Sequence, residues 1–273
     1  MNAPREYKTG VALRRALEER LKKIAREEDF DLQRLWRQVA FDRFLARLFG
    51  QANPAWVLKG GYAMELRFQS ARSTKDLDFT VRVAPPGGLD PVLDQLQEVG
   101  ALDRGDFFSF RIGEASADLE GAPYGGSRYP VEAILGGRRF VKFHLDVGVG
   151  DIVMDPPEEI QARDWLAFAQ IAPPTVLIIQ KEQQFAEKLH AYTLPRPSAP
   201  NSRVRDLVDL VLLIRSNTLS RDKTSQAIHQ TFARRGTHDV PAALASPPGD
   251  WTYGRLQPSW TACTAVRRYG RAV

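Results

Sequence analysis

The sequence has too few thiols for disulfide-based folding or a thiolate metal site. Of its 273 residues only Cys263 is a cysteine, so the chain can form no internal disulfide and no Cys-rich zinc site. Its longest aliphatic run, at residues 176–179, is far shorter than the roughly 20 apolar residues that span a bilayer. The first residues also lack the apolar core of a secretory signal. We therefore expect a soluble, cytoplasmic protein with no membrane partner.

What the chain does contain is enough apolar side chain for a core and a moderate excess of basic charge. Hydrophobic residues make up 43%, which argues against a disordered chain, and the formal net charge of +5 favours polyanionic partners. Much of the basic charge alternates with acidic residues, as at residues 18–23, where a solvated helix face explains it. A less balanced set of arginines is the better candidate for binding nucleic acid: Arg203, Arg205, Arg215, Arg221, Arg234, Arg235, Arg267 and Arg268.

Hydrophobic periodicity predicts a mixed α+β chain. Helices are expected over residues 13–24, 32–48, 89–99, 181–192 and 203–216, with a further helix following Gly60-Gly61. Strands are expected over residues 56–58 and 77–83, and a hairpin over 131–135 and 138–147. Prolines between residues 155 and 174 separate the strands from the later helices. We therefore expect a first domain over residues 1–155 and a mainly helical domain over 156–273, with no predicted structure after about residue 245.

The most informative stretch begins with a diglycine turn. A short apolar strand leads through Lys59 into Gly60 and Gly61, where a helix begins. Because glycine has no side chain, a phosphate can approach the backbone N–H groups that open that helix. Residues 59–61 are therefore candidates for phosphate binding.

A pair of carboxylates follows this turn. Asp76 and Asp78 alternate with apolar residues at period two, so they share one face of a strand. Their mutual repulsion would be relieved by a divalent cation, and oxygen ligands favour Mg²⁺ or Mn²⁺. The alternative is a solvated strand face beside a Gly-rich turn. In the hairpin, Asp146 points away from the apolar side chains, so it is a candidate third carboxylate on the same face or a surface residue.

The later helices supply a lysine and two further aspartates. Lys188 could hold a triphosphate as a compact positive charge, and the alternative is a solvated surface lysine. Asp206 and Asp209 are three residues apart and so lie on one helical face. They are candidates for orienting Lys188 or reading a nucleotide base. The alternative is a structural salt bridge with Arg203 or Arg205.

Taken together, these motifs resemble the AbiEii/MenT-type nucleotidyltransferases, the toxin half of AbiE-like toxin–antitoxin systems, in order and approximate spacing. The resemblance spans roughly residues 10–215 and implies a polymerase-β-like nucleotidyltransferase domain with a mixed sheet, followed by a helical C-terminal domain, with the site in the cleft between them. Four motifs carry it: Leu58-Lys59-Gly60-Gly61, Arg72-Ser73-Thr74-Lys75-Asp76-Leu77-Asp78, Ala186-Glu187-Lys188-Leu189-His190-Ala191 and Arg205-Asp206-Leu207-Val208-Asp209-Leu210.

The resemblance also implies roles. Asp76 and Asp78 would bind the catalytic metal, Lys188 would be the family's helix lysine, and Asp209, with Asp206 as the near alternative, its late aspartate. Independently of the resemblance, its position in the hairpin makes Asp146 a candidate to complete the metal shell, or to accept the proton of the attacking hydroxyl if it lies within hydrogen-bond reach. Some members transfer a nucleotide from a nucleoside triphosphate to the 3′ end of tRNA, which blocks translation. The expected partners are therefore a nucleoside triphosphate, an RNA, with tRNA foremost, and a cognate antitoxin.

The chain departs from the polymerase-β pattern at Tyr62, which follows Gly61 where a serine is usual. Backbone N–H groups, Thr74 or Ser73 would then have to contact the phosphates. Two alternative functions stay open at this point. One is nucleotidyl transfer to a small molecule or a protein side chain, and the other is a nucleic-acid-binding module that kept the fold without catalysis.

Overall fold

The structure is a computed structural model that describes residues 6–51, 55–81, 90–119, 121–198, 200–244, 247–248 and 251. The helices are α1 (Gly10–Glu27), α2 (Leu32–Leu48), α3 (Gly60–Arg67), α4 (Asp90–Ala101), α5 (Lys181–Thr193), α6 (Val204–Arg215) and α7 (Arg221–Arg235), with a short 3₁₀ helix η1 (Ala167–Ala169). The strands are β1 (Trp56–Lys59), β2 (Asp76–Val81), β3 (Phe108–Ile112), β4 (Ala117–Asp118), β5 (Gly126–Leu135), β6 (Arg138–Val149), β7 (Glu158–Gln161) and β8 (Thr175–Ile178). The predicted α+β class is confirmed.

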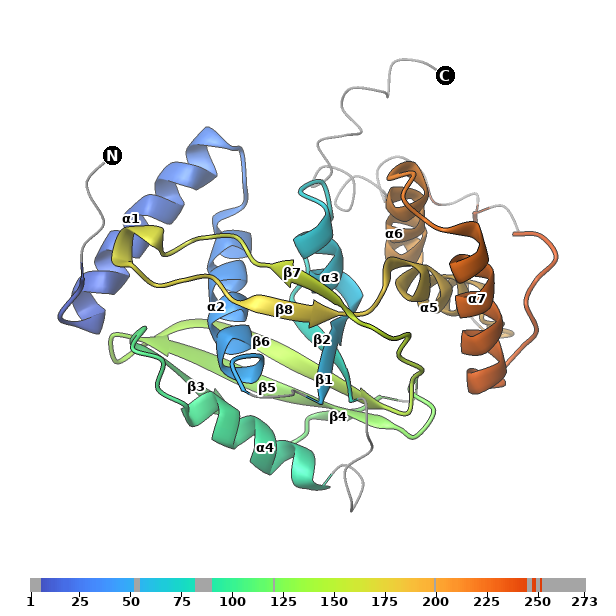
Figure 1. Cartoon of the computed structure of the whole chain (residues 1–273), viewed down its shortest axis with the longest axis horizontal. Helices are drawn as coiled ribbons and strands as arrows, with labels where there is room; N and C mark the ends of the chain where they lie inside the picture. Colours follow the sequence, from blue (N-terminus) through green and yellow to red (C-terminus); the bar gives the residue numbers. More distant parts are fainter. Residues whose placement is uncertain are drawn as a thin grey trace.

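The strands form one mixed sheet in the order β3-β5-β6-β2-β1-β8-β7, with β4 paired to β5 (Figure 1). The β2–β6 and β1–β8 pairs are parallel, and the other pairs are antiparallel. The division between residues 155 and 156 stays a prediction. The sheet itself runs past it, because β8 pairs with β1 and β7 pairs with β8.

The N-terminal helices pack on the sheet through apolar stripes. Helix α1 begins after Thr9, whose side chain accepts the N–H of Ala12, and α2 begins after Asp31, which accepts the N–H of Arg34. Rings on α2 contact the sheet edge to face; Phe41 lies 5.0 Å from Phe143, centroid to centroid. Because side chains alternate along a strand, the residues between these buried positions face the other way.

The opposite face of the sheet is where the polar residues collect. On β2, Leu77 and Phe79 are buried in the core, whereas Asp76 and Asp78, at the alternate positions, are partly exposed. Helices α5, α6 and α7 gather together at one end of the sheet, at the right of Figure 1. The sheet and these helices therefore come together around the residues that the sequence singles out.

The sequence predicted most of the helices and the longer strands, and missed four strands of five residues or fewer and one helix. The predicted helices, strands and hairpin all occur, with ends shifted by a few residues; positions 82–89 and most of the chain after 244 lie outside the described residues. The prediction lacked β3, β4, β7, β8 and α7. β4, β7 and β8 have only two to four residues and are too short to show periodicity, and α7 buries only Ala227, Thr231 and Phe232. The five residues of β3 do alternate between buried and exposed positions, and the prediction overlooked them.

Candidate active site

A row of charged residues crosses four neighbouring strands. Lys59 on β1 lies opposite Asp78 on β2, Asp78 lies opposite Asp146 on β6, and Asp146 lies opposite Arg128 on β5. Residues directly opposite each other in a sheet share a face, so the row places two carboxylates between two cations. Asp146 therefore lies on the same face as the predicted carboxylate pair. Arg128 was not among the residues that the sequence singled out.

Asp78 is the carboxylate of this row with the fewest partners. It accepts one long hydrogen bond, 3.4 Å from the backbone nitrogen of Gly61, and makes no ion pair within 4 Å with any described residue. Burial raises the pKa of Asp78 to about 6, and the neighbouring Asp146 adds to the effect. A bound cation would relieve this cost, so the oxygen ligands here fit a divalent ion.

The diglycine turn is pressed against two polar side chains. Gly60 has φ +67°, and a Cβ atom there would lie 2.1 Å from Oδ2 of Asp78. A Cβ atom on Gly61 would lie 2.7 Å from Oγ1 of Thr74. Glycine is therefore required at both positions to let Asp78 and Thr74 approach the start of α3. Phosphate binding by the turn stays a prediction.

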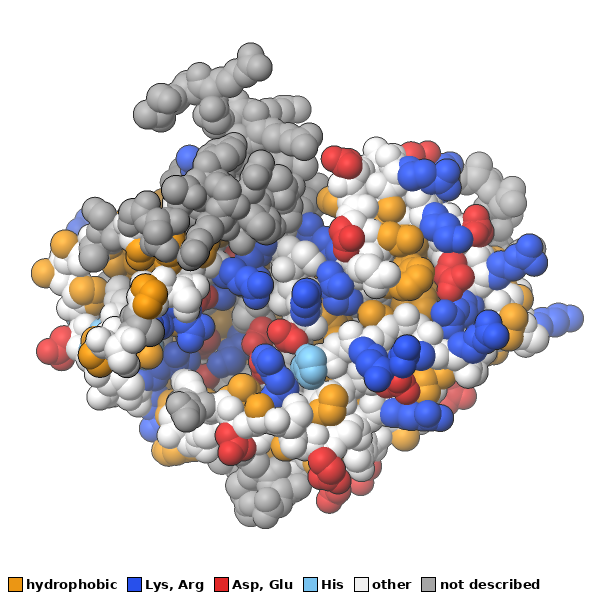
Figure 2. Space-filling model, turned by 180° about the vertical axis from the view of Figure 1, so that it is seen from behind, with side chains coloured by type: hydrophobic (Ala, Val, Ile, Leu, Met, Phe, Trp, Pro, Cys, Tyr) orange, Lys and Arg blue, Asp and Glu red, His pale blue; other side chains and the backbone are white. Residues whose placement is uncertain are grey.

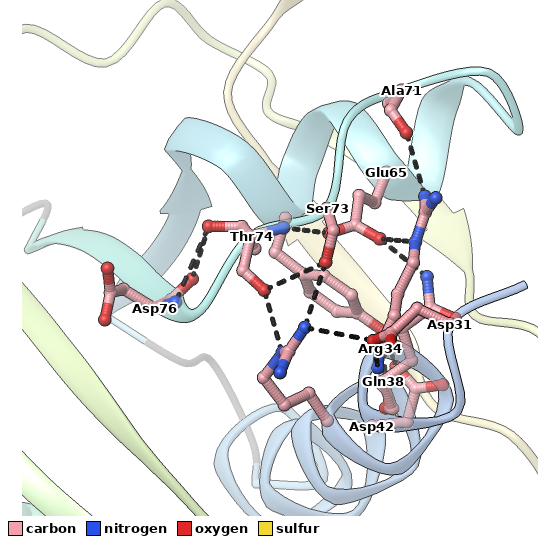
Figure 3. Close-up of polar contacts among 11 residues, drawn as sticks. Asp31, Arg34, Gln38, Asp42, Glu65, Ala71, Ser73, Thr74 and Asp76 are labelled. Carbon is pink, nitrogen blue, oxygen red and sulfur yellow. Dashed lines mark hydrogen bonds and ion pairs between the residues drawn. The ribbon is translucent and has the colours of Figure 1, made fainter. Parts of the chain in front are cut away.

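The loop before β2 is anchored to α2 and α3 by a buried polar network. The Thr74 N–H donates to Glu65 over 2.6 Å, and the other oxygen of Glu65 accepts from Arg34 at 2.9 Å and Gln38 at 2.7 Å. Figure 3 shows Thr74 lying between this network and Asp76. Thr74 is itself buried, so its visible role is to hold the strand that carries Asp76.

Lys188 is buried between the two aspartates of α6. Its Nζ lies 2.9 Å from Asp206 and 2.9 Å from Asp209, and Asp209 also accepts two hydrogen bonds from Arg72, at 3.1 and 2.9 Å. Burial alone would lower the pKa of Lys188, but Asp209 and Asp206 outweigh it and raise that pKa. The lysine is thus held charged. The alternative pair between Asp206 and Arg203 is longer, at 3.7 Å.

A second cluster of alternating charges adjoins the first. Lys59 contacts Asp151 and lies 3.6 Å from Glu187, while Arg235 lies 2.9 Å from Asp151 and 4.0 Å from Glu187. Burial opposes the charge on Lys59, but Glu187 and Asp151 raise the pKa of its ammonium. Sequence reasoning assigned no role to Asp151 or Glu187. Arg235 did stand in the basic group noted above, while nothing local to Asp151 marks it.

These groups open onto one cavity of about 560 Å³. Its lining includes Lys59, Gly60, Asp78, Asp146, Lys188 and Asp206. The other predicted site residues lie outside the lining: Asp209 is fully buried behind Lys188, and Gly61, Thr74 and Asp76 lie beside Asp78. The structure thus gathers residues from β1, β2, β6, α5 and α6 around one space of a size suited to a nucleotide.

A known protein family matches most of this chain. A model described as "Nucleotidyl transferase AbiEii toxin, Type IV TA system" matches residues 43–259. The chain belongs to the AbiEii nucleotidyltransferase toxin family. This confirms the resemblance drawn from the four motifs.

A solved structure shares the fold. The AbiEii-family chain is similar to MenT4, a nucleotidyltransferase toxin from Mycobacterium tuberculosis H37Rv, with a TM-score of 0.59 and 17% identity, covering 90% of this chain and 89% of that one. It is also similar to JHP933 from Helicobacter pylori, with a TM-score of 0.44 and 15% identity, covering 88% of this chain and 94% of that one; no argument rests on this second likeness. The curated proteins contain no match.

Tyr62 of this AbiEii-family protein points into the core. Its hydroxyl donates to Asp42 over 2.6 Å, and its ring packs edge to face on Phe41 with centroids 4.8 Å apart. The unusual residue after the diglycine therefore fastens α3 to α2. Behind the turn, Gln184 donates to the Gly60 carbonyl over 2.6 Å, a contact that sequence reasoning missed.

Within the described part of this AbiEii-family chain, no three His, Cys, Asp or Glu side chains come together in a way that could hold a metal ion. The ligands on offer are the pair Asp76 and Asp78, which suits Mg²⁺ because that ion is commonly held by one or two carboxylates plus substrate phosphates. Over the same residues, no helix is long and apolar enough to cross a membrane.

Proposed function

We propose that this AbiEii-family protein transfers a nucleotide from a nucleoside triphosphate to an RNA, with the tRNA 3′ end as the expected acceptor, and so blocks translation until a cognate antitoxin restrains it. The observation that supports this proposal is the convergence of Asp78, Asp146 and Lys188, from three separate elements, on one cavity of about 560 Å³. A carboxylate for a cation, a carboxylate for a proton and a fixed ammonium are groups that nucleotidyl transfer uses.

Asp76 and Asp78 would hold Mg²⁺ or Mn²⁺. When bound, the ion would polarise the phosphoryl oxygens of the substrate and offset their charge. The hydrogen bond that Asp78 accepts from Gly61 is long, and the pKa of the Asp78 carboxyl is raised. Both observations support this assignment, because this carboxylate has little else to neutralise it. His144 Nδ1, 3.2 Å from Asp76 Oδ1, orients the other member of the pair.

Lys188 would bind the triphosphate. Its ammonium is fixed in place before substrate arrives, since Asp206 and Asp209 each contact it at 2.9 Å. A fixed charge does not have to reorganise when negative charge develops on the phosphates. Lys59 and Arg235 line the same cavity and would support the same end of the substrate.

A polyanionic acceptor suits the surroundings of the cavity. Arg203 and Arg235 are part of its lining. Figure 2 shows Lys and Arg side chains gathered across the middle of one face of the molecule, around a group of Asp and Glu side chains. The 3′-hydroxyl of such an acceptor would lose a proton on attack, and Asp146, on the cavity wall, is the proposed acceptor of that proton.

The test is to incubate the purified protein with total RNA and each labelled nucleoside triphosphate in turn, with Mg²⁺ or with a chelator. We expect label in RNA with at least one triphosphate, abolished by the chelator. Lys188→Met should lower transfer about 100-fold or more, as expected for losing a preorganised charge. The control Lys23→Met changes an exposed lysine on α1 and should leave transfer intact.

Label in protein or in small molecules instead of RNA would move the acceptor to another class. Binding of the acceptor that falls steeply with salt would support a polyanion, because counterions are released on binding. No label in any fraction, and no Mg²⁺-dependent nucleotide binding by calorimetry, would leave a binding module without catalysis and overturn the proposal.

A further inference from the structure

Arg128 makes a two-point ion pair with Asp146 on the polar face of the sheet. Its Nε lies 2.7 Å from Asp146 Oδ1 and its Nη2 lies 2.6 Å from Asp146 Oδ2, so both carboxylate oxygens are engaged. The same Nη2 lies 3.7 Å from Oδ2 of Asp76. Such two-point pairs of guanidinium and carboxylate are directional as well as strong. The Arg128 guanidinium thus lies between Asp146 and Asp76, one of the two proposed metal ligands.

The strand register builds this arrangement into the sheet. Arg128 is directly opposite Asp146 across the antiparallel β5–β6 pair, and Asp146 is directly opposite Asp78 across the parallel β2–β6 pair. Because Arg128 and Asp146 are opposite each other, the guanidinium reaches the carboxylate directly across the β5–β6 pair. Asp146 is only 9% exposed, so removing its partner would leave a charge with little access to water.

Charge balance points to the number of ions that the site can take. Asp76, Asp78 and Asp146 carry three negative charges, and Arg128 supplies one positive charge. The nearby Lys59 and Lys188 are paired with other carboxylates, Lys59 with Asp151 and Glu187 and Lys188 with Asp206 and Asp209. The two negative charges that remain equal the charge of one divalent cation. A second ion, about 4 Å from the first in two-metal sites, needs carboxylate oxygens of its own or shared ones. Arg128 already occupies those of Asp146.

We propose that Arg128 takes the place of a second metal ion, so that the site holds one divalent cation on Asp76 and Asp78. This inference rests on the proposed function. It makes Asp146 a residue held by Arg128 beside the reaction centre and removes it from the metal shell. It also makes Arg128 a positioning residue, since it acts through the two carboxylates that it contacts.

The experiment counts bound Mn²⁺ on the full-length protein, by calorimetry and by electron paramagnetic resonance, with melting curves to verify folding. The variants are Asp76→Asn, Asp146→Asn, Arg128→Ala and Arg128→Lys, and the control is Arg111→Ala, an exposed arginine on β3. Binding is measured without substrate, so the result does not depend on activity.

We expect one Mn²⁺ per chain in the wild type, the control and Arg128→Lys. Asp146→Asn should keep that ion with affinity changed less than about tenfold, whereas Asp76→Asn should weaken it by about 100-fold or more. Arg128→Ala should bind two ions, because Asp146 is then free to act as a ligand. If Arg128→Ala does not fold, one ion in Arg128→Lys together with one ion in Asp146→Asn still supports the proposal.

Three results would overturn the inference: two ions in the wild type, loss of the first ion in Asp146→Asn, or a single ion in folded Arg128→Ala. The first two leave the proposed function standing, the first with a second metal ion and the second with Asp146 as a ligand of the single ion. No Mn²⁺ bound to the wild type, even with a nonhydrolysable triphosphate added, would reject the metal-dependent function itself and this inference with it.

Discussion

Replacing Asp42 by asparagine should stabilise the protein at neutral and alkaline pH. Asp42 lies on α2, is 1% exposed and accepts the hydroxyl of Tyr62 over 2.6 Å. Burial raises its pKa from 3.8 to about 7, and the Tyr62 hydrogen bond and the charge of Arg43 offset this only in part. A charge at this position is therefore unfavourable in the folded protein. Asparagine keeps the shape and removes the charge.

The magnitude follows from the pKa change. A rise of about 3 pKa units corresponds to about 4 kcal/mol at a pH where Asp42 is ionised in both states. The buried amide that replaces the carboxylate costs about 1–3 kcal/mol where its hydrogen bonds are incomplete. We therefore expect Asp42→Asn to gain about 1–3 kcal/mol at pH 8, which raises the melting temperature by roughly 3–10 °C.

The pH dependence has a definite sign. Between about pH 4 and pH 7 the unfolded chain has released the proton of Asp42 while the folded chain still holds it. The free energy of unfolding contributed by Asp42 thus falls as pH rises through this window and stays low above it. Asp42→Asn lacks this slope, so near pH 4, where the charge term has almost vanished, the variant should be less stable than the wild type by roughly the cost of the buried amide, at most about 1–3 kcal/mol.

The assay is urea unfolding of wild type and variant at pH 4.5, 6 and 8. The matched control is Asp106→Asn, another buried aspartate, whose two oxygens pair with Arg47 at 2.7 and 2.9 Å. Removing that charge leaves the arginine uncompensated, so the control should lose about 3–5 kcal/mol. The reasoning is refuted if Asp42→Asn is less stable than wild type at pH 8, or if the two pH profiles run parallel.

Three further outcomes are expected. Gly60→Ala should impair folding or Mn²⁺ binding, because its Cβ atom would lie 2.1 Å from Oδ2 of Asp78. Gly105 has a similar φ of +65° and open space around it, so Gly105→Ala should lower the free energy of unfolding only by the backbone strain of about 1–3 kcal/mol. Equal effects of the two changes in melting curves would contradict this. Asp209→Asn should cost about 3–5 kcal/mol in urea unfolding, because two buried cations lose their partner, and Asp206→Asn should cost less; the reverse order would be inconsistent with the geometry. Mn²⁺ affinity should weaken as pH falls below about 6, because protons then compete for Asp78, and calorimetry showing a constant affinity from pH 7 to pH 5 would count against that residue as a ligand.

The residues of the candidate site were largely identifiable from local patterns. Period-two alternation placed Asp76 and Asp78 on one strand face, and helical spacing placed Asp206 and Asp209 on one side of a helix, where both contact Lys188. These features depend on neighbours within four residues, and the geometry of a strand or a helix settles them. Why position 60 is a glycine could not be read from the sequence, because a bound phosphate and the Asp78 side chain would each require the absence of a Cβ atom.

The sequence by itself determined the α+β class, all the helices except α7 and the short η1, the hairpin and the carboxylate pair, since each follows from a short-range period in side-chain polarity. Only the tertiary structure decided that Lys59, Asp78, Asp146 and Arg128 form a row, because strand order and register join segments far apart in the chain. Arg235 reaches Asp151, 84 residues away, because the end of α7 packs beside the end of β6. The pairing of charges between residues far apart in the chain depends on how the elements pack, so a short-range pattern in the sequence cannot predict it.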